Sequence, residues 1–176
     1  MSVKKEFVVP VVVLLFICFF VSGALAVVNS VTYPIITDAG LERAAEARAK
    51  ILPQADGFEE LFIDGLPRTI REVYRATNNV GYIFEVWVRG YGRDDIKMLC
   101  GVDMNGRIIT ATVLSHSETI SFYNRVFSEQ HAGQFWGKNR SGVEEIAAIT
   151  GATISSKALQ NALLDSLTAF EQVRSR

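Results

Sequence analysis

An uncharged stretch of 22 residues at positions 7–28 constrains this chain more than any other feature. Wound into one helix, it would be about 33 Å long, close to the hydrocarbon thickness of a bilayer. Lys4 and Lys5 precede the stretch, and no Lys or Arg follows it before Arg43. Because basic flanks stay on the cytoplasmic side, we expect a single-pass helix in the inner or plasma membrane. The N-terminus would be cytoplasmic and everything after residue 30 extracytoplasmic.

A cleaved signal peptide is the alternative reading of the same stretch. Ala24-Leu25-Ala26 resembles a small-x-small cleavage site, and the basic start also fits. The apolar core of a signal peptide is usually about 7–15 residues long, so the length favours a retained anchor in contact with membrane lipid. In both cases the remaining chain is exported.

We expect three parts along the chain: residues 1–30 with the transmembrane helix, a juxtamembrane helical connector at 31–56, and an extracytoplasmic domain at 57–176. The connector helix would begin at Thr37 or Asp38 and end before Pro53. The formal net charge of −1 offers no basic surface for nucleic acid. Cys18 and Cys100 fall in different parts and show no metal-ligand spacing, so we expect no metal site.

The middle of the chain has the composition of strands. The segment 82–88 is rich in β-branched and aromatic residues, and the segment 71–76 alternates weakly between polar and apolar residues. With the segments 96–102 and 107–114, they predict an antiparallel sheet of at least four strands. Asn105-Gly106 between the last two is a strong hairpin signal. We further expect a helix or irregular segment at 121–138 and a short buried strand at 146–149. The overall fold class is therefore α+β, with one antiparallel sheet flanked by helices.

Four hydroxyl residues crowd into positions 150–156, the sequence Thr-Gly-Ala-Thr-Ile-Ser-Ser. Apolar residues follow at helical spacing: Leu159, Leu163, Leu167 and Phe170. A helix that starts at this cluster would direct free N–H groups and the positive end of its dipole at a bound anion. A simple helix cap, which needs only one hydroxyl, is the alternative.

Other polar and aromatic residues give weaker signals. His116 and His131 lie outside any nucleophile-elbow motif, and we interpret His116 as holding a turn at a strand end. Glu118 and Thr119 follow a long strand, where polar groups often orient ligands; a solvent-facing strand end is equally consistent. Tyr91, like the other aromatics, could stack on a planar cofactor or simply fill the core.

The order of these motifs resembles the FMN-binding domain of two related membrane complexes. One is the G subunit of the Rnf-type ferredoxin:NAD oxidoreductase, and the other is the C subunit of the sodium-translocating NADH:quinone reductase. The similarity spans positions 81–156 and most of the soluble part. The matching elements are Gly81-Tyr82-Ile83-Phe84, Gly90-Tyr91-Gly92, Gly101-Val102-Asp103-Met104-Asn105-Gly106, His116-Ser117-Glu118-Thr119 and Thr150-Gly151-Ala152-Thr153-Ile154-Ser155-Ser156.

The resemblance implies that Thr153 carries FMN covalently through a phosphoester, installed from FAD by a separate flavin transferase with magnesium. Gly151 and Ala152 would give clearance, Ser155 and Ser156 would contact the phosphate, and Thr150 would complete the motif. Glu118, Thr119 and Tyr91 would lie near the isoalloxazine ring.

The sequence departs from the pattern of the family in two places. Ile120-Ser121-Phe122-Tyr123 replaces its usual Pro-Gly-Leu-Gly, so Phe122 or Tyr123 could take over backbone contacts to the ring. Ala147 replaces an Asp that often precedes the flavin-bearing Thr by six residues.

The resemblance thus implies an electron-carrying subunit of a membrane-bound, ion-translocating ferredoxin:NAD oxidoreductase complex, with other membrane subunits as partners. The short chain favours the Rnf type over the quinone reductase. A membrane-anchored FMN-binding sensory module is the alternative function. A pilin-like structural protein fits least, because the chain lacks the Gly-Phe-x-x-x-Glu start and a pilin does not explain residues 150–156.

Overall fold

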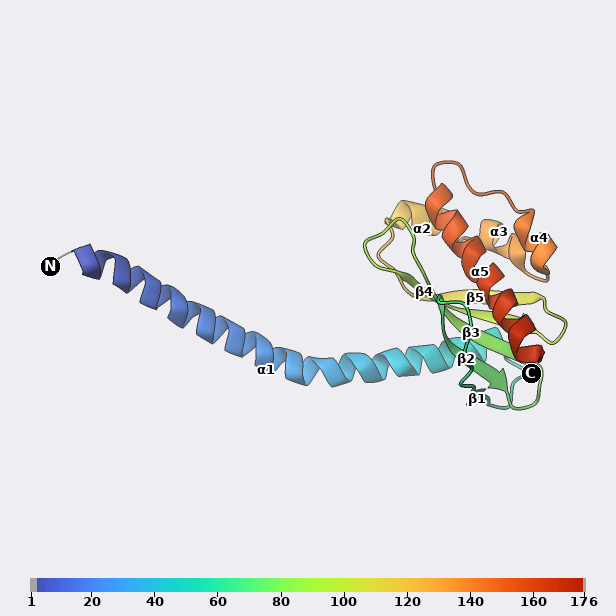
Figure 1. The fold of residues 1–176 in the computed structure, drawn as a ribbon, viewed down its shortest axis with the longest axis horizontal. Coiled ribbons are helices and arrows are strands. Elements are labelled where there is room, and N and C mark those ends of the chain that lie inside the picture. Colours follow the sequence, from blue (N-terminus) through green and yellow to red (C-terminus); the bar gives the residue numbers. More distant parts are fainter. Residues whose placement is uncertain (1–2, 176) are drawn as a thin grey trace. The chain divides into compact units, whose positions relative to one another are not determined.

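The computed structural model describes the backbone of residues 3–175 and the side chains of 8–33 and 40–175. The chain divides into two compact units, Met1–Arg43 and Ala44–Arg176, with the boundary inside helix α1 (Val3–Ile51). Each unit is described by itself (Figure 1).

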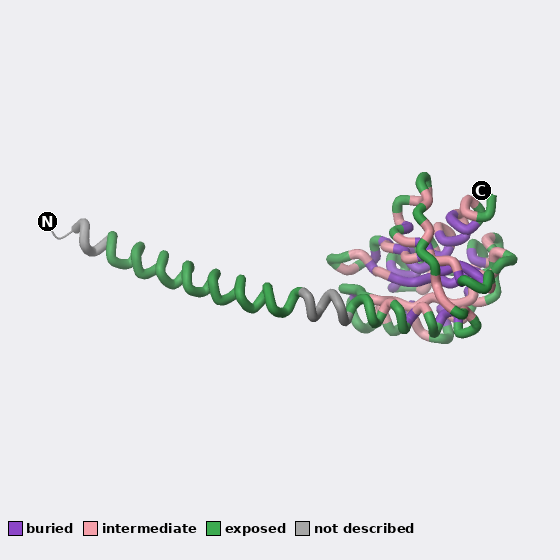
Figure 2. The backbone as a smooth tube through the Cα atoms, turned by 90° about the horizontal axis from the view of Figure 1, so that it is seen from below, coloured by how far each residue is buried: buried purple, intermediate pink, exposed green. Residues whose placement is uncertain are grey.

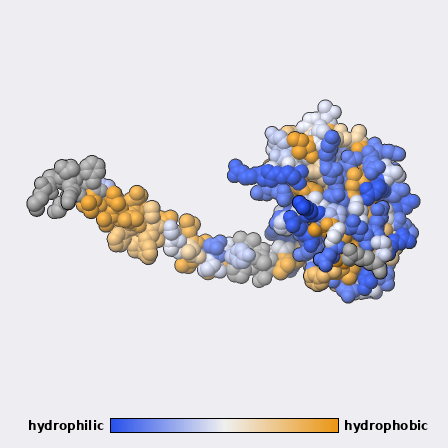
Figure 3. Space-filling view, viewed as in Figure 1, coloured by the Kyte–Doolittle hydropathy of each residue, from blue (hydrophilic) through white to orange (hydrophobic). Residues whose placement is uncertain are grey.

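The first unit consists of the N-terminal part of α1. Its segment Val8–Tyr33 is long and apolar enough to cross a membrane, and its side chains are exposed along its whole length (Figure 2). Figure 3 shows apolar side chains covering this segment. A helix of this length that is apolar on all sides is suited to lipid rather than to water. The predicted N-terminal apolar helix is therefore confirmed.

The expected start of a second helix at Thr37 or Asp38 is not found. The backbone is helical from Val3 through Ile51, because local propensity at a polar residue does not end a helix that is already propagating. The side chains that were expected to cap it lie in the segment 34–39, outside the side chains that the structure describes. The end before Pro53 is as predicted.

The second unit contains the predicted antiparallel sheet, in the order β1-β2-β3-β4-β5. Its strands are β1 (Phe58–Glu60), β2 (Ile70–Ala76), β3 (Gly81–Val88), β4 (Ile96–Asp103) and β5 (Ile108–Ser115). The short edge strand β1 was not foreseen, because three residues carry no readable alternation. Every neighbouring pair is antiparallel, which confirms the α+β class.

The Asn-Gly turn forms the predicted hairpin between β4 and β5. Gly106 has φ +73°, a conformation that glycine adopts at little cost. The Asp103 carboxylate accepts hydrogen bonds from the N–H groups of Asn105 (2.9 Å) and Arg107 (2.8 Å). The turn chemistry thus fixes the register of the two strands.

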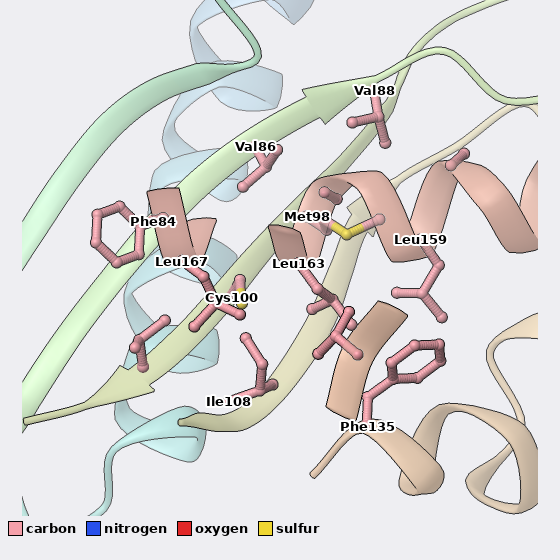
Figure 4. Packing of buried hydrophobic residues seen from close by; sticks show 14 of the residues in the cluster. Phe84, Val86, Val88, Met98, Cys100, Ile108, Phe135, Leu159, Leu163 and Leu167 are labelled. Carbon is pink, nitrogen blue, oxygen red and sulfur yellow. The ribbon is translucent and has the colours of Figure 1, made fainter. Parts of the chain in front are cut away.

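Helix α5 (Thr153–Arg174) covers one face of the sheet and forms the main core. Leu159, Leu163 and Leu167 point from the helix towards the strands (Figure 4). Each is almost fully buried, and each contributes roughly 1.5–3 kcal/mol by leaving water. The predicted apolar stripe of the last helix is confirmed, and its packing fixes the start of α5 relative to the sheet.

The end of α1 packs on the opposite face of the sheet. Ala47, Ile51 and Leu52 form a second buried cluster with Ile83 of β3 and Leu99 of β4. Strands β3 and β4 are therefore buried on both faces. These last turns of α1 belong to the hydrophobic core of the second unit.

Between β5 and α5 the chain forms short helical pieces. These are α2 (Ile120–Val126), α3 (Glu129–Ala132), the 3₁₀ turn η1 (Gly133–Phe135) and α4 (Arg140–Glu144). The strand expected at 146–149 is wrong: this segment pairs with no strand. The Gln160 side-chain amide donates to the carbonyls of Val143 (2.7 Å) and Ile146 (3.2 Å), so a side chain, rather than a strand, satisfies these backbone groups.

A carboxylate on the sheet gives a prediction about pH. Glu85 of β3 lies opposite Glu72 of β2, and burial raises the pKa of the Glu85 carboxyl above its ordinary value of 4.5. The hydrogen bond from Trp87 Nε1 (2.7 Å) opposes this shift, while the Glu72 carboxylate adds to it. The folded state therefore holds this proton more tightly than the unfolded state, and stability falls as the pH rises above the ordinary pKa.

We expect Glu85→Gln to melt at a higher temperature than the wild type at about pH 7, with the difference shrinking by about pH 4. The measurement is thermal unfolding of the full chain in detergent at both pH values. A difference independent of pH would contradict the assignment.

Candidate functional site

Three segments that are far apart in sequence meet beside the first turn of α5. They are the Gly90-Tyr91-Gly92 loop after β3, the segment 116–119 after β5, and the segment 150–156. Glu118 joins them: its Oε1 accepts a hydrogen bond from the N–H of Gly92 (2.7 Å), and its Oε2 accepts one from the hydroxyl of Ser155. The side chain is only 5% exposed. A buried carboxylate with two donors organises its surroundings.

The two glycines of the loop allow this close approach. A Cβ at Gly90 would collide with the Glu118 carboxylate, and one at Gly92 would lie 2.6 Å from the carbonyl oxygen of Ser117. The hydroxyl of Ser117 also accepts from the N–H of Asp94 (2.6 Å). The loop therefore lies directly against the segment that carries Glu118.

The start of α5 has no side-chain cap. Gly151 has φ +80° and Ala152 is the N-cap residue, without a side-chain hydrogen bond. The first helical N–H with a carbonyl partner is that of Ser156, which donates to Ala152 (2.9 Å). Helix geometry leaves the preceding N–H groups, those of Thr153, Ile154 and Ser155, without an intrahelical acceptor. This is the arrangement that receives an anion.

The four hydroxyls of the motif differ in their surroundings. Ser155 and Ser156 are 1% and 2% exposed, and both are used inside the protein: Ser155 donates to Glu118, and the hydroxyl oxygen of Ser156 accepts from the N–H of Ile149 (3.1 Å). Thr150 and Thr153 are exposed. The Thr153 hydroxyl makes only a long hydrogen bond of 3.4 Å to the carbonyl of Ile149, so its oxygen is accessible.

A pocket of about 280 Å³ opens beside Thr153. Tyr91 and Phe122 form one side of it, with their rings edge to face at 5.4 Å. The other side comes from the helix start, through Gly151, Ala152, Thr153, Ile154 and Ser155. Aromatic walls and an uncapped helix end combine the surfaces that a planar ring and a phosphate require.

Several larger hollows lie elsewhere in the described domain. One, of about 710 Å³, adjoins the C-terminal end of α5 near Arg140 and Arg174, and one, of about 740 Å³, follows the loop around residues 61–68. Neither of these two is lined by a residue of the three segments, and the same holds for the hollows of about 290 and 400 Å³. We therefore place the site at the smaller pocket.

Residues 120–123, which depart from the family pattern, form the first turn of α2. Thr119 precedes it, is exposed, and accepts the N–H of Phe122 (2.9 Å) through its carbonyl. Phe122 lines the pocket, whereas Tyr123 stacks on His116 at 3.9 Å. The Nδ1 of His116 accepts the N–H of Glu118 (3.2 Å), so His116 holds the turn, as its position suggested.

Arg125 is a neighbour of the site that the sequence motifs did not indicate. Its Nη2 donates to the carbonyl of Thr150 at 2.9 Å. A single arginine in a helix that departs from the family pattern leaves no readable signal. Among the described residues there is no group of three His, Cys, Asp or Glu side chains that could hold a metal.

Comparison with known proteins defines first the class of domain and then the family. Residues 90–168, which contain all three segments, match the FMN-binding domain. The G subunit of the ion-translocating oxidoreductase complex of Methanosarcina acetivorans is 31% identical, covering 93% of this chain and 94% of that protein. The chain therefore belongs to the family of G subunits of ion-translocating oxidoreductase complexes.

Two further relatives have more specific names. The G subunit of the Na(+)-translocating ferredoxin:NAD(+) oxidoreductase complex of Acetobacterium woodii is 26% identical over 85% of this chain and 84% of its own length. Its counterpart in the proton-translocating complex of Clostridium ljungdahlii is 26% identical over 89% and 85%.

Proposed function

We propose that this chain carries FMN covalently on Thr153 and relays electrons within a membrane-bound ferredoxin:NAD oxidoreductase complex. The observation that carries the proposal is the exposed Thr153 hydroxyl on the first residue of an uncapped helix, next to an aromatic pocket. In the attachment, Thr153 Oγ1 bonds to the FMN phosphorus of FAD, AMP leaves with the electrons of the broken pyrophosphate bond, and the hydroxyl proton is released. A separate flavin transferase with Mg²⁺ would catalyse this transfer.

The residues around Thr153 fit such a group. The free N–H groups of the first turn of α5 would hold a phosphate on Thr153, and the positive end of the dipole of this 22-residue helix would favour its charge. Tyr91 and Phe122 offer ring surfaces beside the acceptor. Gly151 and Ala152 place no large side chain over the helix start. Because the hydroxyls of Ser155 and Ser156 are used internally, we assign them to holding the loop, and Glu118 to joining it to the sheet.

FMN, when bound, accepts electrons and passes them on; the protein supplies attachment, orientation and surroundings. We propose that Val8–Tyr33 anchors the chain in the lipid bilayer, with Lys4 and Lys5 on the cytoplasmic side and the FMN domain outside. Outside the membrane a dissociable cofactor would be lost by dilution, so covalent attachment suits this location. The relatives, which are named as complex subunits, support partners among other membrane subunits.

The test is isolation of the tagged full chain from its native membranes in mild detergent. We expect other membrane subunits and ferredoxin:NAD oxidoreductase activity to co-purify with the wild type. Thr153→Ala should assemble equally well but lose the activity. Isolation of the flavin-bearing chain alone would instead favour the membrane-anchored sensory module.

A further inference from the structure

The guanidinium of Arg125 lies over the turn that precedes the acceptor threonine. Its Nη2 donates to the Thr150 carbonyl at 2.9 Å. If Gly151 carried a Cβ, the nearest atom to it would be Nη1 of Arg125, at 3.6 Å, when the atoms of Gly151 and its two chain neighbours are left aside. One side chain from α2 thus lies against two successive residues of the segment that leads into α5.

The Arg125 guanidinium uses only some of its hydrogen-bond donors. Arg125 is exposed, and a guanidinium has five N–H donors. The ion pairs found among the described residues belong to other arginines, namely Arg75, Arg89 and Arg140. Arg125 therefore retains donors and its full positive charge beside the Thr150-Gly151 turn.

Thr153 follows Gly151 by two residues, so a phosphodiester on Thr153 would bring one negative charge close to the turn that Arg125 contacts. Among the other hydroxyls of the motif, those of Ser155 and Ser156 already have partners, and Thr150 is exposed. The donors near Thr153 include the free N–H groups of the helix start and the Arg125 guanidinium, which already contacts the turn before it. Arginine is well matched to phosphate oxygens because its donors form a planar fork.

We propose that Arg125 is a positioning residue that holds the phosphodiester on Thr153 against the start of α5. This inference rests on the proposed attachment of FMN. It adds a specific cation that the motif does not contain, supplied by the helix that replaces the usual Pro-Gly-Leu-Gly of the family.

The experiment compares Arg125→Met with two controls in the full chain, co-produced with a flavin transferase. Arg125→Met removes the charge and keeps an aliphatic stem. Lys157→Met removes an equal charge from α5, four residues after Thr153. Arg68→Met removes a charge from the loop before β2, in a segment apart from the site.

Three quantities are measured: the initial rate of flavin incorporation, the ³¹P chemical shift of the attached phosphodiester, and the melting temperature of the flavin-free chain. We expect the Arg125→Met rate to fall about tenfold, the size of one charge-assisted hydrogen bond. Its ³¹P resonance should shift, and its flavin-free melting temperature should stay close to that of the wild type. Arg125→Lys should recover part of the rate.

The possible outcomes distinguish the role of Arg125 from the covalent attachment of FMN on which that role depends. A wild type that takes up no flavin contradicts the attachment itself. If the wild type and Arg125→Met incorporate flavin at the same rate with the same ³¹P shift, only the role of Arg125 is wrong. Equal losses in Arg125→Met and Lys157→Met would show a general effect of charge and would also overturn the specific assignment.

Discussion

Glu118→Ala is expected to destabilise the domain by about 3 kcal/mol, because it leaves the buried hydroxyl of Ser155 and the N–H of Gly92 without their acceptor. The same change separates the loop after β3 from the start of α5, so we also expect flavin incorporation at Thr153 to fall at least tenfold. Denaturant unfolding of the flavin-free chain measures the first effect, and fluorescence of the denatured chain measures the second.

Glu118→Gln is the matched control. The amide keeps the size of the side chain and one oxygen acceptor, and its NH₂ group can donate to Ser155 instead. We expect this variant to lose about 1 kcal/mol and to keep most of its flavin. If Glu118→Ala unfolded at the same denaturant concentration as the wild type, Glu118 would not join the loop to the start of α5.

Gly92→Ala is the second change with a large expected effect. The added methyl group would lie 2.6 Å from both the carbonyl carbon and the oxygen of Ser117, and these are backbone atoms that cannot rotate away. The loop must shift, which costs roughly 1–3 kcal/mol as overpacking does. The shift would also weaken the hydrogen bond from Gly92 to Glu118. We expect lower stability together with reduced flavin incorporation, measured as for Glu118→Ala.

Gly133→Ala provides the comparison for this glycine. Gly133 has φ −58° and would place its Cβ at least 3.8 Å from the nearest atom considered. Alanine fits there and reduces the conformational entropy of the unfolded chain. We therefore expect the free energy of unfolding to stay the same or to rise by up to about 0.5 kcal/mol. A Gly92→Ala variant as stable as Gly133→Ala would show that the loop does not pack tightly against Ser117.

Local sequence signals predicted the parts of the fold that depend on neighbouring residues. The apolar anchor, the Asn-Gly hairpin and the stripe of Leu159, Leu163 and Leu167 each follow from one periodicity or one turn type. The strand expected at 146–149 failed because its apolar run was too short to separate strand from loop, and the Gln160 side chain satisfies the backbone there. The helix boundary near Thr37 failed because neighbouring turns propagated through it.

The sequence motifs predicted which segments form the candidate site, but they did not predict which side chains contact one another there. The motif placed Thr153 at a helix start, and the structure has that start at Thr153. Ser155 and its partner Glu118 lie 37 residues apart along the chain, and a single sequence does not show which distant hydroxyl meets which carboxylate. Arg125 was missed for the same reason, since only the fold brings α2 to the Thr150 carbonyl.

The most direct test of covalent attachment is fluorescence of the denatured chain on a gel, after co-production with a flavin transferase and in the native host. We predict fluorescent bands for the wild type and for Thr150→Ala, and a dark band for Thr153→Ala. Thr150 is the matched control, because it is an exposed threonine of the same motif. A dark wild-type band in the native host, or a fluorescent Thr153→Ala band, would contradict the covalent attachment at Thr153.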